Sequence, residues 1–245
     1  RGTHERTTGR HLREINAAVT QLGRLISDDP TVAEVIWSSL RGMVLVEMIV
    51  AGNADGVLGA PNFNSVIIGT AVNRINSPAQ IFVDAAGALW LADMGNNRVL
   101  RFDNAATLPN GANASGELGQ VDFNSAMSGT TASNFNHPFG VTGDPGGRMY
   151  ITDLFNNRLL IFNNAANIPD GSPATNVLGQ PDFISNTPAT NISGMYWPYF
   201  LFLDTKLYVT EEANQRVVSF VPFSSLLPIR LTNSPPSHAV TAGLV

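Results

Sequence analysis

The sequence contains no cysteine, and only 13% of its 245 residues are charged. The absence of cysteine excludes a disulfide framework and any metal site built from thiolates. The charged fraction is about half of that in an average protein, which is typical of chains whose strands are packed on both faces. The net charge of −5 provides no basic surface for nucleic acid, and only residues 1–14 are rich in arginine and histidine.

Long apolar runs and short catalytic motifs are also missing. The longest apolar run, MVLVEMIV at residues 43–50, is too short to span a bilayer and contains Glu47. The sequence has no signal peptide, no Gly-x-Ser-x-Gly nucleophile motif and no phosphate-binding loop. The chain starts at Arg1 rather than Met, so the absence of a signal decides nothing about location. The compartment is unknown, and an exported or cell-surface bacterial protein is the expectation.

The sequence does contain a repeat with a period of 60 residues. An LGQxDF-like element begins near residues 57, 117 and 177, and a segment from proline to aspartate follows it each time. A third element, LADMGNNRVLRF, returns with its arginine at positions 98, 158 and 216. The last interval is 58 because a turn has lost residues, which a hairpin tolerates. Agreement between the three elements indicates a repeat architecture, with repeats at about 66–125, 126–185 and 186–245.

Each repeat predicts four short antiparallel strands separated by turns. In the first repeat these are Gln80–Asp84, Leu89–Asp93, Arg98–Phe102 and the ELGQ segment at 117–120. The copies of the first three strands are predicted at Gly140–Asp144, Met149–Asp153, Arg158–Phe162, Phe200–Asp204, Leu207–Glu211 and Arg216–Phe220. The strands are apolar at nearly every position, which suits sheets that are covered on both faces. Radially stacked four-stranded blades provide such cover.

Two of these segments, SPAQIFVDAAGALWLADMGNNRVLRF and HPFGVTGDPGGRMYITDLFNNRLLIF, resemble NHL repeats. The family's unit has proline, a strand ending in Asp, a glycine turn, a second strand ending in Asp, and Asn-Arg before a third strand. The third copy departs from this pattern with Glu211 and Gln215. The resemblance covers residues 51–245 and implies an all-β fold, a β-propeller of four-stranded antiparallel blades, usually six. It also implies binding to protein, glycan or RNA, or, in a minority of relatives, metal-dependent lyase or hydrolase chemistry.

The number of repeats leaves an alternative open. Three blades cannot close a propeller, because closed propellers have about four to eight. The chain is either a fragment of a longer array, or one half of a homodimer in which two half-propellers together supply six blades. We expect one of these two arrangements.

Residues 10–42 follow a helical period instead of the repeat. Leu12, Ile15, Val19, Leu22 and Ile26 lie on one helical stripe, and a second apolar stripe follows the Asp-Pro at residues 29–30. A short helical flank is therefore predicted for 1–42, with the blades in 43–245. The flank is expected to cover a blade edge, or to act as an arm that binds a partner or a second copy.

An acidic residue and an arginine lie five positions apart in each repeat, across a tight turn. A carboxylate there can accept hydrogen bonds from the N–H groups of the turn while the guanidinium pairs with it. Because a catalytic group is needed only once, threefold repetition favours a structural turn staple over an active site. The pairs are Asp93 with Arg98, Asp153 with Arg158, and Glu211 with Arg216.

A second set of carboxylates, Asp84, Asp144 and Asp204, follows the innermost strand of each blade. These side chains either start a turn or form a ring at the channel mouth that could hold Ca²⁺. No cofactor is expected, with Ca²⁺ as the alternative. Lyase relatives use a histidine-bound zinc, but His137 is the one histidine inside a repeat, and its copies are Ser77 and Trp197. No catalytic residue is predicted, and the metal ligands are unknown.

The binding surface is predicted on the loops between blades. The aromatic residues Tyr196, Trp197 and Tyr199 cluster at a strand entry and are candidates for a glycan or peptide surface. The links at 120–138 and 180–198 are rich in Asn, Ser and Thr, and loops on a rigid scaffold commonly carry binding. The sequence thus predicts a non-enzymatic binding or scaffold module for a protein or glycan partner. The alternative is a metal-dependent propeller enzyme with its site at the central channel.

Overall fold

A computed structural model describes residues 54–221 of the chain. The contact pattern divides the chain into Arg1–Asp55 and Gly56–Val245, and the following account concerns the second unit alone. The predicted helical flank at 1–42 and the apolar segment at 43–50 lie outside the described residues. No helix within the described range is long and apolar enough to cross a membrane.

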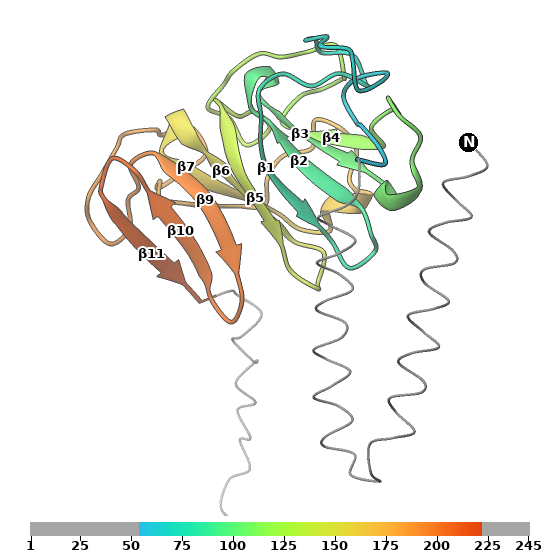
Figure 1. Cartoon of the computed structure of the whole chain (residues 1–245). Coiled ribbons are helices and arrows are strands. Elements are labelled where there is room, and N and C mark those ends of the chain that lie inside the picture. The colour runs from blue at the N-terminus through green and yellow to red at the C-terminus, as the bar shows by residue number, and fades with distance from the viewer. Residues whose placement is uncertain (1–53, 222–245) are drawn as a thin grey trace, which may run out of the picture. The chain divides into compact units, whose positions relative to one another are not determined.

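The described residues form three antiparallel sheets, one from each repeat (Figure 1). The first sheet contains β1 (Pro78–Val83), β2 (Leu89–Asp93), β3 (Arg98–Phe102) and β4 (Gly116–Leu118). The second contains β5 (Pro138–Gly143), β6 (Met149–Asp153), β7 (Arg158–Phe162) and β8 (Asn176–Leu178). The third contains β9 (Pro198–Leu203), β10 (Leu207–Glu211) and β11 (Arg216–Phe220). Its predicted fourth strand falls in residues 222–245, outside the described part.

Short 3-10 turns connect the strands at equivalent places in the first two repeats. Between the second and third strands lie η1 (Met94–Asn96) and η3 (Leu154–Asn156). After the third strands come η2 (Ala105–Thr107) and η4 (Ala165–Asn167). The tight Asn-rich turns predicted at residues 94–97 and 154–157 are therefore single 3-10 turns, whereas the third, at 212–215, is a turn without a 3-10 helix.

The predicted second and third strands are confirmed at both ends in all three repeats. The first strands begin two residues earlier than predicted and end one residue earlier, so Asp84, Asp144 and Asp204 lie in the following turn. A register shift explains the early start: Pro78 pairs with Asp93, but the next aligned pair is Ile81 with Leu91. Such a bulge adds residues to one strand without breaking the ladder.

The sheets pack face against face in the order of the repeats. We call the face of a sheet that is turned toward the preceding repeat its near face, and the opposite face its far face. On the far face of the first sheet, Trp90 and Val99 are buried against Ile151 and Leu160 on the near face of the second. Tyr150 on the far face of the second sheet contacts the third in the same way. Because β6 and β7 are buried at every position, the middle sheet is covered on both sides, as in propeller blades.

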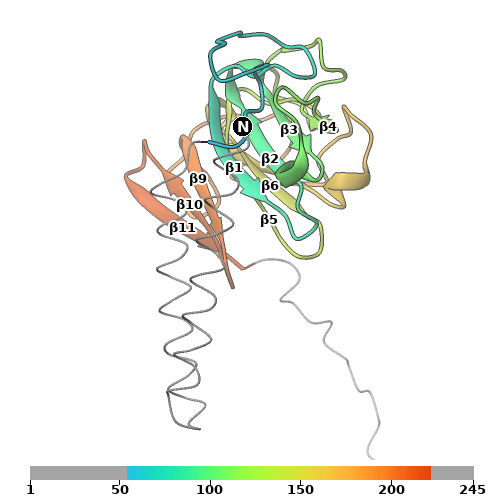
Figure 2. The same ribbon diagram turned by 45° about the vertical axis from the view of Figure 1, so that its right-hand side comes forward.

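The first strands of the three sheets, β1, β5 and β9, lie next to one another on the inner side of the array (Figures 1 and 2). The side-chain amide of Gln80 on β1 reaches β9 and bonds both backbone groups of Leu201. Its Nε2 donates to the carbonyl oxygen at 2.9 Å, and its Oε1 accepts from the N–H at 3.1 Å. Gly140 on β5 occupies the equivalent position, and a Cβ there would lie 2.4 Å from the carbonyl oxygen of Tyr199. The close approach of β9 therefore requires glycine at this position.

We predict that Gly140→Ala destabilises the protein by about 2 kcal/mol or more, because the added methyl group must displace backbone rather than a flexible side chain. The matched control is Gly69→Ala, whose Cβ would meet Arg74 Cγ at an ordinary 3.6 Å. Urea denaturation of the two variants and the wild type measures the difference. Equal stability of the two variants would contradict the close approach of β5 and β9.

Candidate functional site

The acid and the arginine of the first repeat form a fully buried ion pair. Nε of Arg98 lies 2.8 Å from Oδ2 of Asp93, and neither side chain is exposed to solvent. Oδ2 of Asp93 also accepts from Nδ2 of Asn96 at 2.8 Å. Its other oxygen, Oδ1, accepts the backbone N–H of Asn76 at 2.7 Å. The donor expected from the sequence was an N–H of the turn itself, whereas the structure uses the segment that leads into the first strand.

The other two repeats have the same arrangement. Asp153 and Arg158 are fully buried, with Nε and Oδ2 2.8 Å apart, and the N–H of Asn136 donates to Oδ1 of Asp153 at 2.6 Å. In the third repeat Arg216 pairs with Glu211, but the arginine side chain remains 31% exposed. Burial raises the pKa of Asp153 to about 6, although the hydrogen bonds and Arg158 act in the opposite direction.

The guanidinium groups also hold the links between repeats. Besides Asp93, Arg98 donates to the carbonyl oxygens of Ala71 and Arg74 in the preceding link and of Phe123 in the following one, at 3.0–3.4 Å. With Glu117 as a further partner at 3.1 Å, all five N–H donors of this guanidinium have an acceptor. Arg158 likewise donates to backbone carbonyls in the links on both sides, those of Thr131, Asn134 and Phe183. Arg98 therefore has no donor left for a ligand, and four of the five donors of Arg158 are used within the fold, which supports the interpretation as a structural staple.

The asparagine that precedes each arginine connects neighbouring repeats. Asn97 adopts the left-handed conformation, with φ of 53°. Its Oδ1 accepts the N–H of His137 at 2.9 Å, and its Nδ2 donates to the carbonyl of Ala126 at 3.0 Å. Asn157 does the same with Trp197 and Asn186, at 3.0 and 2.9 Å. The sequence analysis missed this contact, although the recurring Asn-Asn-Arg was a visible signal, since asparagine is enriched in left-handed turns.

The aspartates that follow the first strands form hydrogen bonds within their own turns. Oδ1 of Asp84 accepts the N–H groups of Ala86 and Ala88, and Oδ2 accepts from the indole of Trp90 at 2.9 Å. Asp144 accepts from the corresponding turn and pairs with Arg148 at 2.7 Å. The turn after Asp204 is shorter and is closed by its N–H to the carbonyl of Lys206. Among residues 54–221, no group of three or more acidic or histidine side chains is placed to hold a metal ion.

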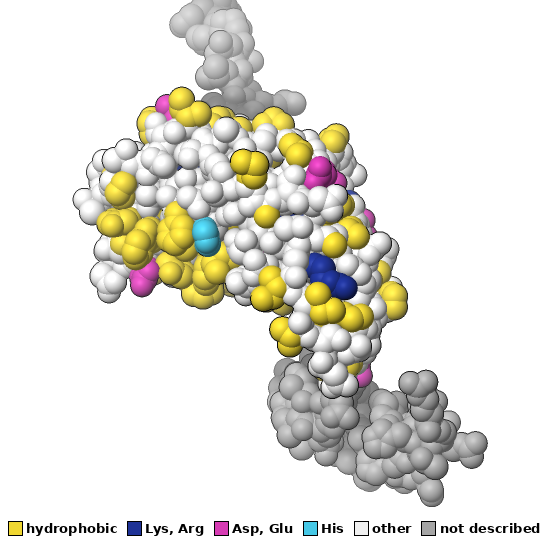
Figure 3. Space-filling view, turned by 90° about the horizontal axis from the view of Figure 1, so that it is seen from above, with side chains coloured by type: hydrophobic (Ala, Val, Ile, Leu, Met, Phe, Trp, Pro, Cys, Tyr) yellow, Lys and Arg dark blue, Asp and Glu magenta, His cyan; other side chains and the backbone are white. Residues whose placement is uncertain are grey.

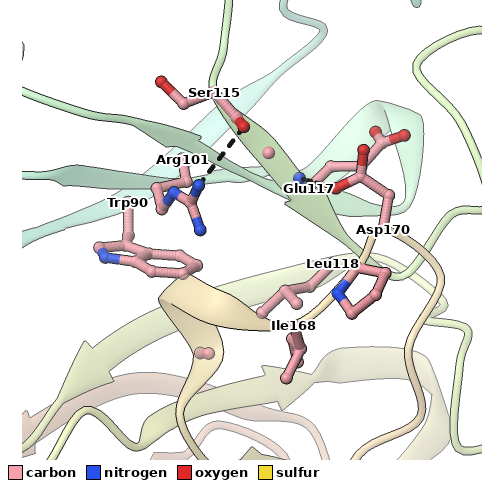
Figure 4. A pocket seen from close by; sticks show the side chains of 10 residues that line it. Trp90, Arg101, Ser115, Glu117, Leu118, Ile168 and Asp170 are labelled. Carbon is pink, nitrogen blue, oxygen red and sulfur yellow. Dashed lines mark hydrogen bonds between the residues drawn. The ribbon is translucent and has the colours of Figure 1, made fainter.

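A pocket of about 230 Å³ lies between the outer strands of the first sheet and the segment after η4 (Figure 4). Arg101 lies over the ring of Trp90, with its guanidinium carbon 5.7 Å from the ring centroid. The guanidinium of Arg101 donates to the carbonyl of Ala166 in the second repeat. Oδ1 of Asp170 accepts the N–H of Glu117 at 2.8 Å. The charged residues that line the pocket thus connect two repeats, and we interpret the pocket as part of the interface between two blades.

Glu117 is a buried carboxyl group that the other repeats lack, since valine occupies positions 57 and 177. Its Oε2 lies 3.1 Å from Nη1 of Arg98, while its Oε1 has no hydrogen-bond partner. Burial raises the pKa of Glu117 to about 7, more than the nearby Arg98 lowers it. The unfolded chain releases this proton near the ordinary value of 4.5. The stability that this group contributes is therefore complete below about pH 4.5 and decreases as the pH rises to about 7.

We predict that Glu117→Val removes this pH dependence. The unfolding free energy of the variant minus that of wild type should be larger at pH 8 than at pH 5. The increase should be at most about 3 kcal/mol, because each unit of pKa shift corresponds to about 1.4 kcal/mol. Denaturant unfolding at both pH values measures the difference. Glu212→Gln, at an exposed position, serves as the control and should leave the profile unchanged. Parallel profiles for wild type and Glu117→Val would contradict the account.

The structure brings the three predicted aromatic residues together with others from the neighbouring repeat. Tyr196 and Trp197 have ring centroids 5.5 Å apart, and Phe155 of η3 lies 6.3 Å from Trp197 and 4.7 Å from His137. Tyr199 lies 4.5 Å from Phe139 on β5 and also contacts Phe200. We call this set the aromatic surface. It consists of His137, Phe139, Phe155, Tyr196, Trp197, Tyr199 and Phe200.

The aromatic surface is open to solvent over much of its extent. Phe155 is 43% exposed, Trp197 37% and Phe200 53%. Figure 3 shows hydrophobic side chains gathered beside the single described histidine on this side of the molecule. The sequence analysis missed Phe139, Phe155 and His137. These residues belong to the second repeat and meet the Tyr196–Tyr199 segment only after the sheets have packed.

The residues before the first strands have a constrained backbone that fixes part of this surface. His137 and Trp197 have φ of 60° and 48°, and each precedes a proline. The left-handed region is unfavourable for non-glycine residues, and proline restricts the residue before it further. Asn97 and Asn157 hold these residues by their N–H groups. The bonds between repeats thus present His137 and Trp197 at equivalent places on successive blades.

Among known proteins, the chain is similar only to solved structures. No protein-family model matches the sequence, and no curated protein matches it. The chain is similar to virginiamycin B lyase from Staphylococcus aureus, with 13% identity over 62% of this chain and 43% of that one and a TM-score of 0.34. A streptogramin B lyase structure gives 14% identity over 65% and 54% of the two chains, with a TM-score of 0.33.

A third likeness is to the extracellular domain of a one-component system from B. thetaiotaomicron, with 14% identity over 60% of this chain and 18% of that one and a TM-score of 0.34. The chain spans about half of the length of the lyases that it matches, or less. We transfer no function from likenesses of this degree. The class of the protein follows from its own three packed antiparallel sheets, which form β-propeller blades.

Proposed function

We propose that this protein is a non-enzymatic binding module of the NHL-repeat type, which binds a protein partner through the aromatic surface. The proposal rests on one observation: aromatic side chains from two repeats lie together and exposed on a scaffold that fixes their backbone. Aromatic residues are enriched at protein interfaces because they bury a large area with few rotatable bonds. The Asn- and Ser-rich links beside them supply hydrogen-bonding groups at the rim.

The orientation of the rings favours a protein over a glycan partner. The planes of Tyr196 and Trp197 are inclined by 66°, and those of Phe155 and Trp197 by 62°. In an edge-to-face pair the edge of one ring is directed at the face of the other, so part of that face is not open to a partner. A sugar would instead need an open ring face. No lysine or arginine belongs to the aromatic surface, so the partner segment is expected to be apolar rather than acidic.

The metal-dependent alternative depends on the carboxylates near the inner strands. Both oxygens of Asp84 accept hydrogen bonds from protein groups, and Asp144 is paired with Arg148. Neither carboxylate is free to act as a metal ligand without breaking its own turn. The binding function is therefore the better supported of the two, and export or display at a bacterial cell surface remains part of the proposal.

We predict that peptides selected from a random displayed library bind the wild-type protein and that Trp197→Ala weakens their binding at least tenfold, since central aromatic residues dominate interfaces. Phe155→Ala should have a similar effect. Phe63→Ala is the matched control, because Phe63 is 53% exposed in a link away from this surface. Titration by fluorescence anisotropy gives the dissociation constants.

Two outcomes would overturn the proposal. The first is the selection of peptides whose affinity does not change in Trp197→Ala or Phe155→Ala. The second is failure of the library together with binding on a glycan array that depends on the same two residues, which would assign the surface to glycans instead. Thermal melting of each variant checks that the fold is retained.

A further inference from the structure

The imidazole of His137 lies inside the aromatic surface, where the neighbouring turns hold it in place. Its ring centroid is 4.7 Å from that of Phe155. The N–H of Leu154 donates to the carbonyl oxygen of His137 at 3.3 Å. The N–H of Phe155 donates to the carbonyl oxygen of Asn136 at 3.1 Å, and Asn97 accepts the N–H of His137 at 2.9 Å. The backbone that carries the ring is therefore fixed before a partner arrives.

A hydrogen bond to the preceding side chain sets the tautomer of this ring. Nδ1 of His137 lies 3.0 Å from Oδ1 of Asn136. An amide oxygen only accepts hydrogen bonds, so Nδ1 carries the proton. The first repeat has the same arrangement, since the hydroxyl group of Ser77 donates to Oδ1 of Asn76 at 3.3 Å. In the neutral imidazole, a proton on Nδ1 leaves Nε2 as an acceptor.

Nε2 of His137 is an acceptor that the fold leaves unused. It has no hydrogen-bond partner among residues 54–221. The residue is partly exposed, and Figure 3 shows it at the surface with hydrophobic side chains beside it. Water can bind this nitrogen in the free protein. A partner that covers the surface must replace that water with a donor, because a buried acceptor without a donor loses its hydration and gains nothing in return.

The donor that fits this place is neutral. The charged side chains next to the residues that hold His137 are buried and paired with one another. They are Arg98 with Asp93 and Glu117, beside Asn97, and Arg158 with Asp153, which accepts the N–H of Asn136. The aromatic surface itself contains no acidic residue. A lysine or arginine of a partner would therefore lose its hydration here without gaining a counter-charge.

We propose that His137 selects the partner of the aromatic surface by accepting, at Nε2, a hydrogen bond from a tryptophan or tyrosine side chain of that partner. These two side chains combine a neutral N–H or O–H donor with a large apolar ring. The ring packs beside Phe155 and Trp197, and the donor reaches Nε2. The inference rests on the proposed function, since it concerns the same surface. A partner with phenylalanine or leucine at this place leaves Nε2 unpaired and is rejected.

The same geometry makes binding dependent on pH. Histidine is the side chain that changes its charge between pH 5 and pH 8. The charged imidazole donates from both nitrogens and offers no acceptor. Its charge also lies beside apolar rings, which disfavours burial under a partner. Affinity is therefore highest at pH 8, where the ring is neutral, and decreases as the pH falls.

The test uses peptides selected on the full wild-type chain at pH 8 from a random displayed library. We expect tryptophan or tyrosine at the peptide position whose replacement weakens binding most. His137→Phe removes the acceptor and keeps a ring beside Phe155, and an aromatic residue is tolerated because Trp197 occupies the equivalent place. This variant should weaken binding about tenfold or more. Exchange of the peptide's tyrosine for phenylalanine should weaken binding to wild type by a similar factor, and binding to His137→Phe much less.

His137→Gln is the matched variant for the effect of pH, because its side chain is polar but does not titrate. Wild type should bind the peptides about fivefold or more weakly at pH 5.5 than at pH 8. The variant should show the same affinity at both values. Asp153 and Glu117 are unchanged in it, so a pH dependence that persists would belong to them and would overturn the role of His137. Thermal melting at both pH values checks that each variant is folded.

The tautomer can be measured without a partner. Long-range proton–nitrogen NMR spectra at pH 8 show which ring nitrogen carries the proton, and the signals that are missing in His137→Phe identify the residue. We expect the proton on Nδ1. A proton on Nε2 would contradict the proposal.

Failure of this inference differs from failure of the proposed function. Peptides that lose affinity in Trp197→Ala but not in His137→Phe would remove the role of His137 and leave the binding surface in place. Peptides that depend on neither Trp197 nor Phe155, or a library that yields no binder, would overturn the binding surface and this inference with it.

Discussion

The buried arginine at the start of β3 and of β7 is the group on which the rest of the structure depends. A guanidinium removed from water is very costly unless its charge is paired and its N–H groups are hydrogen-bonded. Arg98 and Arg158 meet this requirement by binding one carboxylate on their own hairpin and backbone carbonyls of the links on both sides. The links cannot leave these positions without leaving their carbonyl groups and the buried N–H donors of the guanidinium without partners. One side chain thereby fixes the hairpin and the two loops that connect it to its neighbours.

The chain of contacts continues from this group to the surface. The asparagine beside each arginine holds the entry of the next first strand, and that entry carries His137 in one repeat and Trp197 in the next. The aromatic surface is therefore positioned by the same turns that contain the buried ion pairs. In the third repeat Arg216 is partly exposed, and Gln215 replaces asparagine. The turn that departs from the pattern is thus the one that faces no further repeat among the described residues.

The sequence was informative wherever the determining contacts lie within one repeat. The ends of the second and third strands follow from the apolar runs and the Asp and Arg at their borders, and the period follows from the recurring elements. Contacts between repeats were not predictable in the same way. The N–H of His137 that Asn97 accepts and the meeting of Phe155 with Trp197 depend on how the sheets pack. A single repeat contains no information on that packing. Glu117 was visible as a departure from valine, but its burial became apparent only with Arg98 beside it.

The most direct test of this account is a double-mutant cycle on the buried pair of the second repeat, with Asp153→Asn, Arg158→Met and the double variant. We expect each single substitution to cost about 3–5 kcal/mol of unfolding free energy, because it leaves a buried group without its partner. The double variant should lose clearly less than the sum, with a coupling of at least about 1 kcal/mol. Retention of full stability in both single variants, with no coupling and with loss of peptide binding instead, would show that the pair serves the ligand rather than the fold.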